Sequence, residues 1–367
     1  MSTVSTAAIL ALAALGLLTF AAPGRAADAA KSPFIVYISA SGDNAIGRYR
    51  LDRETGALVH LDDTALPGAP GSLALSADKQ FLYAAVRSVE SVATLRVNAT
   101  DGALKLLGTT KVAGNPVYIT PDRSGKYLLT AYYTGNKTAV YPLGGDGTVQ
   151  PVATSLHATG ANPHCLVASP DGRFVFVSNT GADKILQFQF DPATGKLTPN
   201  SPPEVPTPKG DGPRHLVFHP SGKFLFAVNE KSSSATAWKF DGQSGTLTSL
   251  QTLSTLPEGV KVNNTCADIE VTPDGKFLYA SNRGHDSLAR FAIDADTGRL
   301  TALGQTPTEK TPREFALDPL GHFLVAAGQS SDRAAVYRID AATGDLKPLS
   351  VHAVGKSPAW VLLTTLP

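Results

Sequence analysis

The feature that most constrains the fold is a pattern that recurs seven times along the chain. In each copy an aromatic residue opens an apolar run, usually just after an Asp-Gly or Ser-Gly turn, and successive aromatics are 47, 46, 47, 50, 53 and 46 residues apart. The seven aromatics are Phe34, Phe81, Tyr127, Phe174, Phe224, Phe277 and Phe323. A repeat of this length is one supersecondary unit that cannot bury its faces alone, so the copies must stack on one another.

Two further patterns recur once per repeat and in the same order. One is Thr-Gly-x-Leu or a variant, with its glycine at Gly56, Gly102, Gly147, Gly195, Gly245, Gly298 and Gly344. The other is an alternating stretch such as residues 185–190, whose period of two predicts a half-buried strand. No long period of 3.6 residues interrupts the chain after its first segment. Four short strands per copy predict an all-β, seven-bladed β-propeller of four-stranded antiparallel blades, formed as one domain by residues 27–367.

The two ends of the chain explain how such a ring would close. Six repeats begin with a strand before the turn, whereas the first repeat starts directly at Phe34. Residues 357–363 read Ser-Pro-Ala-Trp-Val-Leu-Leu and resemble the missing strand. We therefore expect the C-terminal strand to complete the N-terminal blade, which would leave no open edge at the seam.

The first 26 residues differ from the rest and predict export. Residues 7–20 are almost purely apolar, and Gly24-Arg25-Ala26 offers small residues at positions −3 and −1 of a cleavage site before Ala27. We interpret residues 1–26 as a signal peptide and expect a periplasmic protein. No Lys or Arg precedes the apolar run, and a retained membrane anchor is the alternative, although the run is short for a bilayer.

Charge and cysteine content restrict the classes of ligand and the cysteine chemistry that we expect. The net charge is +1, with 32 basic and 31 acidic residues, which gives no electrostatic footprint for nucleic acid and no polybasic membrane stripe. We expect a small-molecule ligand, no membrane partner after cleavage, and a monomer. The two cysteines, Cys165 and Cys266, fall two blades apart in the repeat, which favours buried thiols and leaves a disulfide as the alternative.

The repeat also predicts which side chains surround the mouth of the central channel. In a blade the innermost strand starts at one rim and the second strand returns to it, so two rings of equivalent positions should meet there. Counting back ten residues from each aromatic marks the first ring, at Gly71, Val117, His164, Arg214, Ala267 and Arg313, with Ala359 as the seventh. Counting forward six residues marks the second ring, at Ala40, Arg87, Tyr133, Thr180, Glu230, Arg283 and Gln329.

Chemically active side chains are concentrated in these rings. Guanidiniums suit a carboxylate, a phosphate or a developing oxyanion, an imidazole moves protons near neutral pH, and a carboxylate completes an acid–base pair. The candidate catalytic residues are His164, Arg214, Glu230 and Arg283, and the candidate substrate-binding residues are Arg87, Tyr133, His285, Arg313 and Gln329. A structural ring of ion pairs around a water-filled channel is the competing interpretation, and His285 could equally cap a turn.

Other titratable residues carry weaker signals. His219 and His322 fall in hairpin turns on the opposite rim, where we expect solvated side chains. Asp183 and Asp268 could support the candidate site or join neighbouring blades. No metal-binding, phosphate-binding or nucleophile-elbow motif is present, and we expect neither a metal nor a cofactor.

Several motifs resemble those of the seven-bladed β-propeller lactonase family. They are Gly212-Pro-Arg-His-Leu-Val-Phe-His-Pro-Ser-Gly222 followed by Asn229-Glu230, Ser281-Asn-Arg-Gly-His-Asp-Ser287, Asn162-Pro-His-Cys165, and Thr311-Pro-Arg-Glu-Phe-Ala-Leu-Asp318. The resemblance covers essentially all of residues 27–367. The family includes bacterial 6-phosphogluconolactonases and fungal carboxymuconate cyclases. Relatives usually carry Asn-Gln where this chain has Gly328-Gln329, and often an acidic residue where it has Thr180.

The resemblance implies a metal-independent enzyme that opens or forms a small acidic or polyhydroxy lactone. It also implies that His164, Arg214, Glu230 and Arg283 form the site, because these residues match the proposed site of the cyclase branch. An exported lactonase for an aldonolactone such as gluconolactone is our leading hypothesis, with Glu230 or His164 activating water. A cycloisomerase of muconate type and a propeller that binds a partner without turnover are the alternatives.

Overall fold

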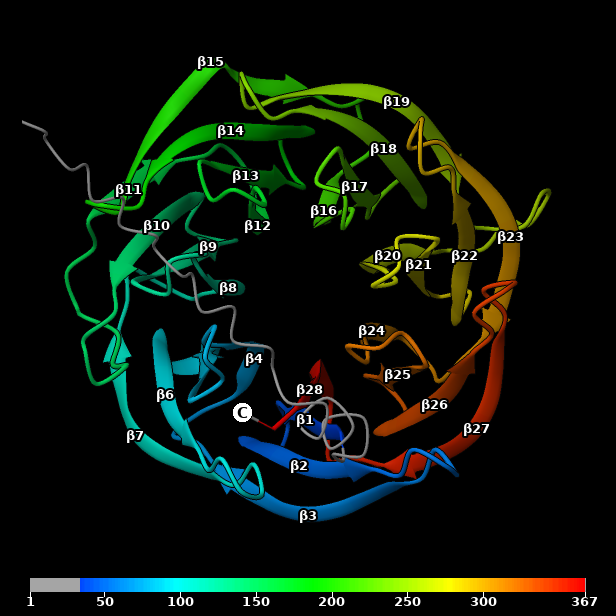
Figure 1. Ribbon diagram of the computed structural model, residues 1–367, viewed down its shortest axis with the longest axis horizontal. Helices are drawn as coiled ribbons and strands as arrows, with labels where there is room; N and C mark the ends of the chain where they lie inside the picture. The colour runs from blue at the N-terminus through cyan, green and yellow to red at the C-terminus, as the bar shows by residue number, and fades with distance from the viewer. Residues whose placement is uncertain (1–33, 367) are drawn as a thin grey trace, which may run out of the picture. The chain divides into compact units, whose positions relative to one another are not determined.

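In the computed structural model, which describes residues 34–366, seven four-stranded antiparallel sheets circle a central channel (Figure 1). The seven-bladed propeller predicted from the repeat is confirmed. Residues 1–26, which the sequence predicts to be a signal peptide, lie outside the described residues. Among the residues described, no helix has the length and apolarity needed to cross a bilayer.

Each blade runs from an inner strand at the channel to an outer strand at the periphery. Blade 1 contains β28 (Pro358–Thr365), β1 (Phe34–Ala40), β2 (Ala45–Leu51) and β3 (Leu58–Ala65). Blade 2 contains β4 (Pro70–Leu75), β5 (Phe81–Val86), β6 (Ser91–Val97) and β7 (Leu104–Lys111), with the 3-10 turn η1 (Arg87–Val89) between its second and third strands. Blade 3 contains β8 (Tyr118–Pro121), β9 (Tyr127–Tyr132), β10 (Lys137–Pro142) and β11 (Ser155–Ala158).

The remaining four blades follow the same order from the channel outward. Blade 4 contains β12 (Pro163–Ala168), β13 (Phe174–Asn179), β14 (Lys184–Asp191) and β15 (Lys196–Pro206). Blade 5 contains β16 (Pro213–Phe218), β17 (Phe224–Asn229), β18 (Ser234–Asp241) and β19 (Thr246–Ser254). Blade 6 contains β20 (Thr265–Val271), β21 (Phe277–Arg283), β22 (Ser287–Ile293) and β23 (Leu300–Pro307). Blade 7 contains β24 (Pro312–Leu317), β25 (Phe323–Gly328), β26 (Arg333–Ile339) and β27 (Leu346–Ala353).

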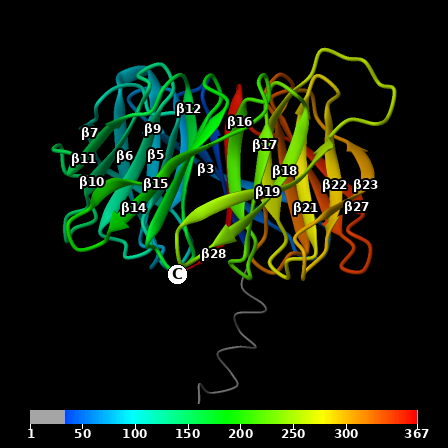
Figure 2. The ribbon, with the colours of Figure 1, turned by 90° about the horizontal axis from the view of Figure 1, so that it is seen from above.

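The C-terminal strand closes the ring, as the sequence predicted. β28 pairs antiparallel with β1, from Phe34 opposite Thr365 to Ala40 opposite Pro358. The last strand of the chain therefore supplies the inner strand of the first blade, and the sheet at the seam has four strands like every other (Figures 1 and 2). The seam carries its own cluster of buried side chains, in which Val361 and Leu363 of β28 pack with Val325 of blade 7.

The two strongest repeat signals contact each other between blades. Every repeated aromatic is the first residue of a second strand, and every repeated glycine has a positive φ. In blade 5, Gly245 has φ 70° and lies so close to the Phe174 ring of blade 4 that a Cβ would collide with it. Gly298 meets Phe224, and Gly344 meets Phe277, in the same way. The glycine is required both for its backbone conformation and for the close packing of one blade on the next.

Candidate functional site

The first predicted ring of residues gathers at one end of the channel, which we call the arginine end. Six of its seven positions line a single cavity there: Gly71, Val117, His164, Arg214, Arg313 and Ala359. Arg87 of the second ring lines the same cavity. The seventh position, Ala267, contributes its carbonyl oxygen, which accepts a hydrogen bond from Arg214 Nη1.

Bulges in the inner strands allow consecutive residues to face the channel. In blade 5, Pro213 pairs with Asn229 and Leu216 with Ala227, so Arg214 and His215 together stand opposite one residue. The pairing shifts at the equivalent place in blades 4, 6 and 7. Such a bulge locally breaks the strict alternation of faces. The channel is therefore lined by two successive layers of side chains from the same strands.

Short polar side chains fix the loops that lead into the inner strands. Asp183, at φ 50°, accepts hydrogen bonds from the backbone N–H groups of Gly210 and Gly212 at 2.9 Å, just before Arg214. Asp286, at φ 52°, accepts one from Thr311 at 2.8 Å, two residues before Arg313. Asp183 therefore acts as a structural contact that places the first turn of the next blade, which was one of the two roles considered for it.

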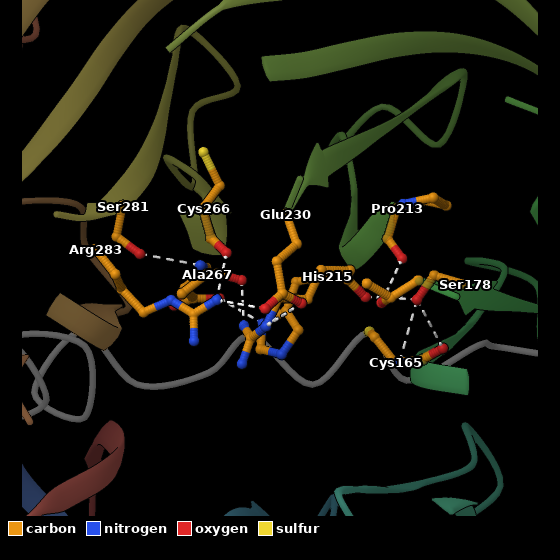
Figure 3. Close-up of polar contacts among 12 residues, drawn as sticks. Cys165, Ser178, Pro213, His215, Glu230, Cys266, Ala267, Ser281 and Arg283 are labelled. Atoms are coloured by element: carbon orange, nitrogen blue, oxygen red, sulfur yellow. Dashed lines mark hydrogen bonds and ion pairs between the residues drawn. The ribbon is translucent and has the colours of Figure 1, made fainter. Parts of the chain in front are cut away.

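Glu230 and two arginines form the centre of the arginine end. Glu230 follows β17, and its Oε1 accepts a hydrogen bond from Arg283 Nη2 at 2.6 Å (Figure 3). Arg214 Nε lies 3.6 Å from Glu230 Oε2. The side chains of Glu230 and Arg283 are 20% and 14% exposed, whereas that of Arg214 is 2% exposed. A ligand could therefore contact Glu230 and Arg283. Arg214 is buried and forms an ion pair with the Glu230 carboxylate.

His164 lies beside this centre. Its ring is 5.7 Å from that of Tyr133 and 5.1 Å from that of His215, measured between centroids. Burial, followed by the positive charges of Arg214 and other neighbours, holds the pKa of His164 well below its usual range. The imidazole is therefore neutral at pH 7, and its buried Nδ1 has no hydrogen-bond partner among the described residues. Burial also raises the pKa of Tyr133, and Glu230 adds to the effect.

Arg313 and Arg87 complete the cationic lining. Burial lowers the pKa of Arg313 to about 9, with further lowering from Arg214, Arg283 and Arg87. Arg87 also has a pKa lowered by burial, and its Nε donates to Asn115 Oδ1 at 3.1 Å. Several guanidiniums that lower one another's pKa are a preformed site for an anion, because a bound negative charge would relieve their repulsion.

Two predicted residues lie outside this group. The side chain of His285 is hydrogen-bonded to Ser287 at 2.8 Å, and its backbone N–H donates to Asn264, so its described contacts are those of a loop cap. The backbone N–H of Gln329 donates to the Thr311 carbonyl, and its side chain, like those of Glu230, Arg283 and Tyr133, does not line the small cavity at the arginine end. Substrate contact by His285 and Gln329 remains a prediction. No described hydrogen bond joins either residue to Glu230 or Arg283.

One expectation for the opposite rim was wrong. His219 is not solvated: it is 6% exposed, and its ring is hydrogen-bonded to Ser221 at 2.8 Å and to the Gly275 carbonyl of blade 6 at 2.9 Å. His322 is exposed, as expected. The two cysteines are both buried and free, so the disulfide alternative does not hold.

A second layer of polar side chains lies one residue further along the inner strands, and only Asp268 among its three members was considered from the sequence. It contains His215, Asp268 and Glu314, which are 3%, 2% and 4% exposed. They line a cavity of about 490 Å³ that opens at the hairpin turns near Asp122 and Arg123, and we call this the acidic end. Glu270 lines it as well. Shifting the ring count by one position would have revealed this layer.

Aromatic rings separate the two ends of the channel. The rings of Tyr118, His215 and Trp360 come from blades 3, 5 and 1, and their centroids are 5.4 to 5.7 Å apart. Trp360 and Glu314 line both cavities. Two cavities thus meet at this aromatic layer, one with Arg87, Arg214 and Arg313 in its lining and the other with Asp268, Glu270 and Glu314.

One end of the closed propeller thus combines several guanidiniums with a carboxylate and a neutral imidazole, the groups that can bind an anionic or carbonyl compound and move a proton on it. A family model described as "Lactonase, 7-bladed beta-propeller" matches residues 35–363. The chain is 35% identical to a 6-phosphogluconolactonase of Serratia proteamaculans over 327 residues, which cover 89% of this chain and 98% of the relative. It is 36% identical to a 6-phosphogluconolactonase of Cronobacter sakazakii, over 89% of this chain and 97% of the relative.

A solved structure described as the periplasmic gluconolactonase of Pseudomonas aeruginosa is similar throughout. It superposes with a TM-score of 0.85 at 28% identity, covering 92% of this chain and all of that one. The chain belongs to the seven-bladed β-propeller lactonase family. The resemblance inferred from its motifs is confirmed, as is the expectation of a lactone-hydrolysing enzyme.

Proposed function

We propose that the protein hydrolyses a small aldonolactone, such as gluconolactone, at the arginine end of its channel after export to the periplasm. The observation that carries the proposal is the cluster of Glu230, Arg283 and His164, with Glu230 held between two guanidiniums at 2.6 and 3.6 Å. The relatives named above support the lactone, and the gluconolactonase from Pseudomonas aeruginosa supports an unphosphorylated sugar.

The proposed reaction uses Glu230 as the general base. Its carboxylate takes a proton from water as the water oxygen attacks the lactone carbonyl carbon. The carbonyl oxygen becomes an oxyanion beside Arg283, whose fixed N–H donors stabilise that charge. The ring C–O bond then breaks, and the leaving alkoxide takes the proton that Glu230 had accepted. We favour Glu230 over His164 as the base because the imidazole is more deeply buried and its pKa is low.

Arg214 has a different task in this proposal. Because its side chain is only 2% exposed, we treat it as a positioning residue that orients Glu230. Neutral His164 would donate a hydrogen bond to the ring oxygen, and Arg313 and Arg87 would bind the hydroxyl-rich or acidic part of the substrate.

The direct test is turnover of glucono-1,5-lactone by the purified protein beginning at Ala27, corrected for the fast spontaneous reaction. We expect a rate that rises in proportion to enzyme and saturates with substrate. Parallel assays with 6-phosphogluconolactone and with a carboxylated muconate use the same protein. Turnover of the muconate alone would support the cycloisomerase, and no turnover of any of the three would support a binding role.

Export is tested by cell fractionation. The full-length chain should appear in the periplasmic fraction, shortened at its N-terminus, whereas a chain starting at Ala27 should stay in the cytoplasm. Recovery of the uncleaved chain with the membranes would support the retained anchor instead.

A further inference from the structure

We propose that the acidic end of the channel is a binding site for a divalent transition-metal ion, held by His215, Asp268 and Glu314. One ligand atom from each of the three side chains lies within 4.8 Å of the others. The residues come from β16, β20 and β24, so three consecutive blades converge on one point. This site is separate from the residues proposed to hydrolyse the lactone.

The His215 imidazole is hydrogen-bonded at only one of its two nitrogens within residues 34–366. Its Nδ1 is hydrogen-bonded to Asp268 Oδ1 at 2.8 Å, so with the carboxylate ionised this nitrogen carries the proton. Nε2 is buried with no hydrogen-bond partner among the described residues, so it is free to carry the imidazole N–H instead. An ion between the two side chains would replace the proton at Nδ1, and both Nδ1 and the Asp268 carboxylate would then bind the ion.

The carboxylates of Asp268 and Glu314 both keep lone pairs that could bind an ion. Asp268 accepts backbone hydrogen bonds from Ile269 at Oδ1 and from Phe315 at Oδ2, which fixes its orientation and leaves a lone pair on Oδ2. No described group donates a hydrogen bond to the Glu314 carboxylate, and no described Lys, Arg or His lies within ion-pair distance of it. Burial, followed by the charge of Asp268, raises the pKa of Glu314 well above its usual range, and Arg214 and Arg313 oppose that rise only in part.

The three side chains can be reached from solvent through the cavity at the acidic end. All three side chains line the cavity that opens at the hairpin turns, so an ion could enter from the acidic end and keep water as its remaining ligands. One imidazole with two carboxylates suits Zn²⁺, Mn²⁺ or Co²⁺, whereas Ca²⁺ and Mg²⁺ prefer oxygen ligands alone. We therefore expect a transition-metal ion rather than calcium.

The test is calorimetric titration of the untagged, EDTA-treated protein with Zn²⁺. We expect one site per chain with a dissociation constant near or below about 1 µM, and binding weakened at least about tenfold in both His215→Gln and Glu314→Gln. The matched control is Glu230→Gln, which removes a carboxylate at the other end of the same channel and should leave the affinity unchanged. His60→Ala removes the exposed His60–Asp63 pair, a possible weak surface site, and should also leave it unchanged.

A second measurement does not depend on how well the variants fold. Co²⁺ added to the unmodified protein should produce visible d–d absorption bands, and Zn²⁺ should displace them. The proposal is overturned if the unmodified protein binds no Zn²⁺, if the His215→Gln and Glu314→Gln variants bind it as tightly as the unmodified protein, or if Ca²⁺ binds more tightly than Zn²⁺. Neither the calorimetric nor the spectroscopic measurement depends on lactone turnover.

Discussion

The two ends of the channel are built from the same seven inner strands, yet their chemistry is opposite. At the arginine end the strand starts and second-strand ends present Arg87, Arg283 and Arg313, with Glu230 between guanidiniums. One residue further along the inner strands, the lining becomes His215, Asp268 and Glu314. The bulges make this possible, because they turn neighbouring residues of one strand toward the same channel.

The difference shows how a propeller can place separate sites on one axis. The fold supplies two rings of positions per inner strand, and the aromatic layer of Tyr118, His215 and Trp360 lies between them. A change at one end should therefore leave the other end working, whereas a change to the closed ring should damage both.

The largest effect is expected from opening the ring. Deleting residues from Pro358 onward removes β28, and with it Ala359 from the arginine end and Trp360 from the aromatic layer. Because β1 would lose its inner partner along its whole length, we expect the melting temperature to fall by more than about 10 °C. Circular dichroism melts measure this. A truncated chain that melts within a degree or two of the full protein would contradict the closure model.

A large effect confined to the arginine end is expected from Arg283→Met and Glu230→Gln. Each should lower kcat/KM for the lactone by about 100-fold or more, because a charge-stabilising donor or the proton acceptor is lost. Steady-state kinetics give the result. The control is Glu270→Gln, which alters a carboxylate of the acidic end outside the proposed ligand set and should stay within about threefold of the unmodified enzyme. Equal losses in all three variants would mean that the two ends are not independent.

Moderate effects are expected from Asp183→Gly and Asp332→Gly. Comparing the two variants separates a role in positioning the site from a role in overall stability. Asp183→Gly removes the acceptor that fixes Gly210 and Gly212 before Arg214, while Asp332→Gly removes the equivalent acceptor for Ser357 at the seam. Glycine tolerates the positive φ of both positions, so backbone strain is matched. We expect similar small losses of stability, about 1 kcal/mol each, but roughly tenfold lower kcat only for Asp183→Gly. Equal activity in the two variants would argue against this role of Asp183.

The smallest effect is expected at the two thiols. Burial raises the pKa of Cys165 to about 12 and that of Cys266 to about 11, so neither forms a thiolate at neutral pH. We expect a thiol reagent to label neither cysteine in the native protein and both after denaturation, and dithiothreitol to leave the melting temperature unchanged. Rapid labelling of the native protein would show that the layers around the channel open more readily than the packing indicates.

The repeat made the fold predictable, because each repeated residue has a structural role in the blade. The aromatic starts the second strand and packs on a glycine of the next blade, and both features are legible in the residues. Spacing alone also placed His164, Arg214 and Arg313 in one ring. Spacing could not show that Arg214 is almost fully buried or that His285 is a loop cap, since those depend on side-chain packing.

The acidic end was missed for a related reason. The ring count took one position at the start of each inner strand and did not consider the residue after it, so His215 and Glu314 were not among the candidates. The bulges that turn them inward leave no signature as plain as a glycine or a proline. Only the three-dimensional pairing revealed that two consecutive residues share the channel.

The most direct test of the central claim is a crystal structure of the protein soaked with gluconate, the product of the proposed reaction. We predict density for the sugar acid at the arginine end, with its carboxylate on Arg283 and its hydroxyls near Glu230 and His164. Density only at the acidic end, or an empty arginine end at a gluconate concentration that saturates binding in solution, would contradict the account.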